Sequence, residues 1–115
     1  APYEEIKINV DGFETSENSE KITISYASQI KADVKINEIG LNSFNEIYTT
    51  KEACKNSENL ENMKNCFNEN LGNFNAEVAE KSSANEKQRV VTLTSKRSFL
   101  IDNKEENIKL RFIPI

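Results

Sequence analysis

Residues 50–81, TKEACKNSENLENMKNCFNENLGNFNAEVAEK, are the stretch in which the hydrophobic pattern of this chain changes. On both sides of it, apolar and polar residues alternate with the period of two that is typical of half-buried strands. Within it, apolar residues recur every three or four positions, as on one face of an α-helix. They are Leu60, Met63, Phe67, Leu71, Phe74 and Val78. The pattern predicts one helical insertion, at about residues 50–81, in a chain otherwise made of strands.

This apolar stripe has two interpretations. A helix lying across a sheet buries such a stripe in the core, whereas an uncovered stripe would form a groove for a partner. The opposite face is rich in Asn, which is a weak helix former, so the helix depends on packing for its stability. We therefore expect the stripe to fill the core.

The two cysteines, Cys54 and Cys66, both lie in this insertion. Twelve residues of unbroken helix span roughly 18 Å, whereas a disulfide requires Cα atoms within about 7 Å. A bond between them therefore requires a break in the helix, for which residues 56–59 are the obvious place. The alternative is two free thiols, each buried as a small apolar side chain. The spacing is not Cys-x-x-Cys, so a redox-active pair is not expected.

Capping signals place the ends of the two resulting helices. Thr49 and Glu52 match a capping box, which predicts a short helix near residues 50–56. After a turn, Ser57 is the expected cap of a longer helix from about residue 58. We expect Gly72 to end or bend that second helix.

Short strands are expected around the insertion. The ranges are 3–13, 22–26, a segment around 34–36, 44–48, 89–94, 98–101 and 108–112, with a polar loop at 14–20. Because only one helical region is visible, antiparallel pairing is favoured over a parallel sheet. The expected fold class is α+β: an antiparallel β-sandwich or twisted antiparallel sheet of six to seven strands with the helical insertion. A length of 115 residues predicts a single domain, residues 1–115.

The net charge of −4 conceals an asymmetry. Residues 87–111 hold seven cations against three acids, a local balance of +4 that leaves −8 for the remainder. One interpretation is an ordinary solvated hairpin. The other is a face that meets an acidic partner, with Arg89, Lys96, Arg97 and Arg111 as the candidate partner-binding residues. Nucleic acid is not the expected partner, because the pI is near 5.0 and no aromatic residues interleave the basic ones.

Several chemistries are excluded or disfavoured by composition. The chain contains no histidine, which removes Ser-His-Asp and Cys-His catalysis and nearly all transition-metal sites. Its three glycines are isolated, so no phosphate loop is present. A small enzyme using carboxylates such as Glu5, Asp33 or Glu38 is a residual hypothesis, but no motif surrounds them. We expect no enzymatic activity, no cofactor and no metal.

The remaining observations favour an exported protein. No run of eighteen apolar residues is present, so no transmembrane segment is expected. The chain begins with Ala1 and Pro2, which either signal cleavage or an artificially trimmed end would explain. A disulfide would fit a periplasmic or secreted location. The expected function is a non-enzymatic binding module, an inhibitor or adaptor, that docks on another protein or an envelope component. The alternative is an assembly subunit of an envelope or surface apparatus that offers residues 108–112 as an edge strand.

Overall fold

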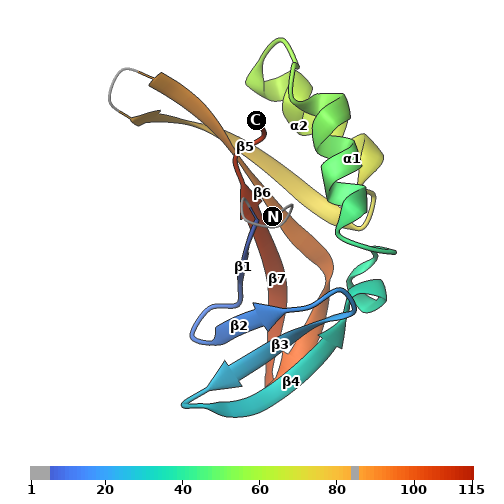
Figure 1. Cartoon of the computed structure of the whole chain (residues 1–115), viewed down its shortest axis with the longest axis vertical. Coiled ribbons are helices and arrows are strands. Elements are labelled where there is room, and N and C mark those ends of the chain that lie inside the picture. The colour runs from blue at the N-terminus through green and yellow to red at the C-terminus, as the bar shows by residue number, and fades with distance from the viewer. Residues whose placement is uncertain (1–5, 84–85) are drawn as a thin grey trace.

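Alternating apolar residues build most of this protein, whose computed structural model describes residues 6–83 and 86–115 (Figure 1). Within these residues there are seven strands, two α-helices and one 3-10 helix. In chain order they are β1 (Lys7–Asn9), β2 (Glu14–Glu17), β3 (Lys21–Tyr26), β4 (Gln29–Lys35), η1 (Ile36–Ile39), α1 (Asn45–Cys54), α2 (Leu60–Asn70), β5 (Phe74–Ser83), β6 (Glu86–Ile101) and β7 (Lys104–Phe112). The fold class expected from the sequence is confirmed: a sandwich-like α+β fold with a helical insertion between β4 and β5.

Two antiparallel sheets form the framework. The four-stranded sheet has the order β1-β7-β6-β5, and the three-stranded sheet has the order β2-β3-β4. In Figure 1 the three-stranded sheet lies against the lower half of the four-stranded sheet, and α1 and α2 lie beside its upper half. We call the face of the four-stranded sheet that meets these elements the inner face, and the opposite one the outer face.

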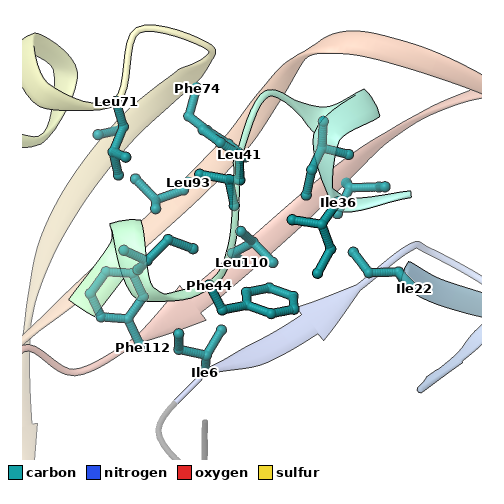
Figure 2. Close-up of a cluster of buried hydrophobic side chains, with 14 of the residues drawn as sticks. Ile6, Ile22, Ile36, Leu41, Phe44, Leu71, Phe74, Leu93, Leu110 and Phe112 are labelled. Atoms are coloured by element: carbon teal, nitrogen blue, oxygen red, sulfur yellow. The ribbon is translucent and has the colours of Figure 1, made fainter. Parts of the chain in front are cut away.

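The core lies on the inner face. Val91 of β6 is the register partner of Phe112 of β7, and Leu93 is the partner of Leu110. All four are at most 3% exposed. Figure 2 shows Leu93, Leu110 and Phe112 in one cluster with side chains of the segments that cover the sheet, such as Leu41 and Phe44. The sheet and its cover therefore share one hydrophobic cluster.

The apolar stripe packs into this core as expected, but only its first part lies in a helix. Met63 and Phe67 of α2 are fully buried, and the Phe67 ring contacts Phe112 edge-on with centroids 5.7 Å apart. The helix ends at Asn70, however, and Phe74 and Val78 belong to β5. The prediction of helix up to residue 81 was wrong because 74, 76 and 78 also satisfy a period of two. Pairing with β6 decides between the two periods.

The predicted break between two helices is confirmed. Cys54, the last residue of α1, is disulfide-bonded to Cys66 of α2, with their Cα atoms 5.7 Å apart. Ser57 does not cap α2. Its hydroxyl donates to the carbonyl of Cys54 at 2.6 Å, and Asn59 caps α2 by accepting from the Asn62 amide at 2.8 Å. Polar side chains of the turn thus bond to the last residue of α1 and cap the start of α2.

The start of the first helix was predicted wrongly. A strand was expected at residues 44–48 and a capping box at Thr49, but α1 already begins at Asn45, so Thr49 and Glu52 lie within it. Leu41, Phe44 and Ile47 are each at most 2% exposed. Their spacing of three residues buries them together as a helical turn enters the core, and this spacing outweighs the local β-propensity.

Two further predictions were wrong, and the strand expected around Val34 and Ile36 is confirmed only in part. The polar loop at 14–20 contains β2, whose residues pair in register with β3. The ranges 89–94 and 98–101 are one strand, β6, with a bulge between Thr94 and Ser98. The segment around Val34 and Ile36 is β4 followed by η1, and Gly40 closes η1 in a left-handed conformation with φ of 94°. Backbone pairing, which composition does not reveal, decides all three.

Candidate functional site

The four cations predicted to bind a partner do not share one face. Arg89 is turned inward: its Nη1 donates to the carbonyl of Ser57 at 2.6 Å and its Nη2 to that of Glu58 at 3.3 Å. The guanidinium therefore joins β6 to the turn between α1 and α2. Its donors are thus used to hold the fold together.

Arg97 and Lys96 lie at the β6 bulge. The Arg97 guanidinium is 5.1 Å from the centroid of the Phe99 ring, and its Nη1 is 3.4 Å from the carbonyl of Glu38. The backbone amide of Lys96 donates to the carbonyl of Asn73 at 3.0 Å, and its side chain is exposed. At the bulge, Arg97 is thus directed toward Glu38 of η1.

Arg111 is the predicted residue that lies on the outer face. It is the register partner of Lys7 of β1 and of Thr92 of β6, and Thr92 is in turn the partner of Glu77 of β5. These four residues form one row across the sheet. They alternate with the buried inner residues of their strands, and Lys7, Glu77 and Arg111 are exposed.

Two adjoining cavities occupy this outer face. The larger, of about 520 Å³, runs along residues 77–82 of β5 and is bounded on its other side by Val90, Thr92 and Arg111. The smaller, of about 250 Å³, reaches Lys7 and Ile113. Both are lined by Lys81, Val90 and Arg111. We call the two cavities together the outer groove.

The outer groove has an excess of unpaired positive charge. Its acids are engaged by cations from outside it: Lys64 of α2 is 3.9 Å from Glu77, and Lys87 of β6 is 3.6 Å from Glu80. Within the described part of the chain, no ion pair is recorded for Lys7, Lys81 or Arg111. Among the described residues, three cations thus border one open groove with no carboxylate paired to any of them.

Two of these cations lie directly opposite each other. Lys7 and Arg111 are cross-strand partners in an antiparallel pair, a geometry in which Cβ atoms are about 5 Å apart and like charges destabilise the sheet. By contrast, the neighbouring Lys109 has Asp11 at 4.0 Å. An anion bound between Lys7 and Arg111 would remove the repulsion, so the groove is suited to a carboxylate or another oxyanion.

Sequence reasoning missed Lys7 and Lys81. Lys7 had a usable signal, since Ile6 and Ile8 flank it and a period of two places it on the opposite face. Lys81 had none, because the segment ending there was assigned to a helix. Register between strands remote in sequence brings both beside Arg111.

The carboxylates considered for catalysis lie apart from this groove. Glu5 is outside the described residues. Asp33 accepts a hydrogen bond from Thr23 Oγ1 at 2.9 Å and lies 3.3 Å from Lys21 Nζ. These two contacts, the Thr23 bond first, hold the pKa of Asp33 below its ordinary value, the opposite of what a general acid requires. Glu38 Oε2 accepts from the Lys35 amide of the η1 cap at 3.4 Å.

The described residues contain no cluster of three or more His, Cys, Asp and Glu side chains placed to hold a metal ion. None of their helices has the length and apolarity needed to cross a membrane.

Comparison with known proteins gives no relative. No protein-family model matches the chain, and the searches of curated proteins and of solved structures return no match.

Proposed function

We propose that this protein is a small, non-enzymatic binding module that docks on another macromolecule through the outer face of its four-stranded sheet. One observation carries the proposal: Lys7, Lys81 and Arg111 border an open groove with no carboxylate paired to any of them among the described residues. Charge complementarity at such a face steers encounter and sets specificity. An inhibitor or an adaptor would use it in the same way.

We further propose an extracytoplasmic location, periplasmic or secreted. The disulfide between Cys54 and Cys66 supports it, because disulfides persist in oxidising compartments and are rare in the cytosol. The partner would then be another exported protein or a component of the cell envelope.

The test is capture from the native envelope or secreted fraction by immobilised protein. A groove variant, Lys7→Gln/Lys81→Gln/Arg111→Gln, is compared with a control of equal charge loss elsewhere, Lys31→Gln/Lys96→Gln/Lys104→Gln. We expect one partner that wild type and control retain and the groove variant loses. Equal retention by all three proteins would refute docking through the outer face.

An assembly subunit is the second candidate function, and it requires a different edge from the one expected. Residues 108–112 belong to β7, which is interior because β1 and β6 both pair with it. The edge strands of that sheet are β1, of three residues, and β5, of ten residues, so β5 is the longer edge. Asn68 pairs with both backbone groups of Ala76, but no hydrogen bond to the outer edge of residues 77–82 is recorded within the described chain.

Strand addition at β5 has its own test. Glu80 has the same parity as Ala76, so its amide points away from β6 and is free to pair with an added strand. Glu80→Pro removes that amide, whereas Glu80→Ala retains it. Concentration-dependent association abolished by the first change and retained by the second would support assembly. A monomer at high concentration would exclude it.

A further inference from the structure

We infer that the outer groove takes an extended acidic peptide segment of a partner protein, with its carboxylates on Lys7, Lys81 and Arg111 and one apolar side chain on Val90. The inference rests on the proposed function and specifies the chemistry of the partner. It follows from the groove's length, charge and apolar floor.

The length of the groove fits an extended segment. Its larger part follows residues 77–82 of β5, and six strand residues cover roughly 20 Å at about 3.3 Å each. The smaller part continues from Arg111 to Lys7 at the opposite edge of the sheet. A single small oxyanion would occupy one end of this groove, whereas an extended peptide of six or seven residues follows its larger part and can reach the three cations, which line the smaller part together.

The charges of the groove select carboxylates on the occupant. Glu77 and Glu80 already face Lys64 and Lys87, which leaves Lys7, Lys81 and Arg111 to pair with the occupant. Lys7 and Arg111 repel each other across β1 and β7 in the empty groove. A carboxylate between them relieves this repulsion, and Arg111 offers two parallel donors to it.

The floor of the groove distinguishes a peptide from a simple polyanion. Val90 lies in both cavities and is 9% exposed, yet it is not part of the hydrophobic core cluster. Its register partner on the outer face is Ala79. An apolar floor between cations matches a strand that alternates acidic and apolar side chains. A nucleic acid or a sulfated polysaccharide would also meet a protein of net charge −4, which repels long polyanions.

The decisive measurement is fluorescence anisotropy with a labelled peptide, Glu-Ser-Glu-Val-Glu-Ser-Glu, on the folded full chain. A second peptide with Gln in place of every Glu controls for charge. We expect wild type and the Lys31→Gln/Lys96→Gln/Lys104→Gln control to bind the acidic peptide within twofold of each other. The groove variant Lys7→Gln/Lys81→Gln/Arg111→Gln should bind at least about tenfold more weakly, because it loses three charge-assisted contacts.

Backbone amide NMR then locates the site. Peptide addition should shift resonances of the outer face, with Val90 and Arg111 among them, and rising salt should weaken binding. Equal affinity for the Glu and Gln peptides, or equal binding by the groove variant, would overturn the inference. So would occupation of the groove by inorganic phosphate or a sulfated polysaccharide in preference to the peptide.

Failure of this inference is separable from failure of the proposed function. If the captured native partner depends on the groove but the acidic peptide neither binds nor competes with it, docking stands and the acidic segment is wrong. If no native partner is retained and the peptide does not bind, both are wrong. Circular dichroism and thermal unfolding of each variant confirm that the fold is intact.

Discussion

The guanidinium of Arg89 donates a 2.6 Å hydrogen bond to the backbone carbonyl of Ser57, thirty-two residues earlier in the chain. A second bond, to Glu58, fixes the same turn. Charge pattern alone placed Arg89 among the partner-binding residues, yet its donors hold the helical insertion against β6. The disulfide between Cys54 and Cys66 closes the same turn covalently. Arg89 therefore ties the turn to the sheet, and the disulfide ties the two helices to each other.

Removal of the arginine should destabilise the protein. Because Arg89→Ala leaves the carbonyls of Ser57 and Glu58 without their charged donor, we expect a loss of about 1.5–3 kcal/mol. Urea unfolding measures it as a lower midpoint at unchanged slope. Arg111→Ala, on the exposed outer face, is the matched control and should change stability by less than about 0.5 kcal/mol. Equal effects of the two substitutions would contradict the assigned role.

Reduction of the disulfide should have a comparable cost. The bond closes a loop with a sequence separation of 12 residues, for which the chain-entropy account gives about 3 kcal/mol. Urea unfolding with and without reductant measures the difference, and Cys54→Ala/Cys66→Ala should resemble the reduced wild type. A thiol assay under denaturing conditions should find no free thiol in the purified protein. An unchanged midpoint on reduction would show that packing alone holds the helices.

Reversal of one groove charge should stabilise the fold. Lys7→Glu converts the repulsive cross-strand pair with Arg111 into an attractive one, which is worth about 0.5 kcal/mol and roughly 2 °C in Tm. Lys7→Gln removes only the repulsion, so its gain should be smaller. Differential scanning calorimetry measures the expected order of Tm, which is highest with Glu at position 7, lower with Gln and lowest with the native Lys. A lower Tm for Lys7→Glu would mean that Lys7 and Arg111 do not interact.

The pKa of Asp33 should depend on Thr23. The hydrogen bond from Thr23 Oγ1, followed by the contact with Lys21, lowers this pKa below its ordinary value of 3.8. The stabilisation is therefore present above the unfolded pKa and is lost as pH falls through the lower, folded value. Thr23→Val should raise the Asp33 pKa toward 3.8 and weaken the pH dependence of stability below that point. Carboxyl NMR titration measures the shift, and Thr15→Val on β2 should leave it unchanged.

The side-chain amide of Asn68 should protect the edge of β5 at Ala76. Asn68 Oδ1 accepts from the Ala76 amide at 2.8 Å, and its Nδ2 donates to the Ala76 carbonyl at 3.4 Å. Asn68→Leu leaves both groups unpaired, and we expect a loss of about 1–3 kcal/mol together with self-association through the opened edge. Thermal unfolding and sedimentation velocity detect the two effects. Asn65→Leu, on the exposed side of α2, should cause neither.

Sequence patterns were reliable where one period had no competitor. The alternation of Ile22 and Ile24 specifies β3, and the spacing of Met63 and Phe67 specifies α2, because each pattern has one face to bury. At Phe74 and Val78 the two periods coincide, and the helix was extended too far. The length of a helix alone requires a break between Cys54 and Cys66 if they are bonded, and the structure has both the bond and the break.

The candidate site was accessible to sequence reasoning only in part. Arg111 was identified from the charge asymmetry, and Lys7 was readable from its alternation with Ile6 and Ile8. Lys81 was hidden by the wrong assignment of its segment, and no pattern in the chain showed that Arg89 and Arg97 would contact backbone carbonyls. Charge indicates which side chains attract anions, but hydrogen-bond geometry decides which of them are already engaged.

The sequence by itself determined the fold class, the helical insertion and the need for a helix break if Cys54 and Cys66 are bonded. These depend on local periodicity and on the fixed rise of a helix, which act over a few residues at a time. Only the tertiary structure decided which cations meet: Lys7, Lys81 and Arg111 lie on three strands that are brought together by β-register. Register depends on the burial of a whole face at once, so residues more than a hundred positions apart become neighbours without a local signal.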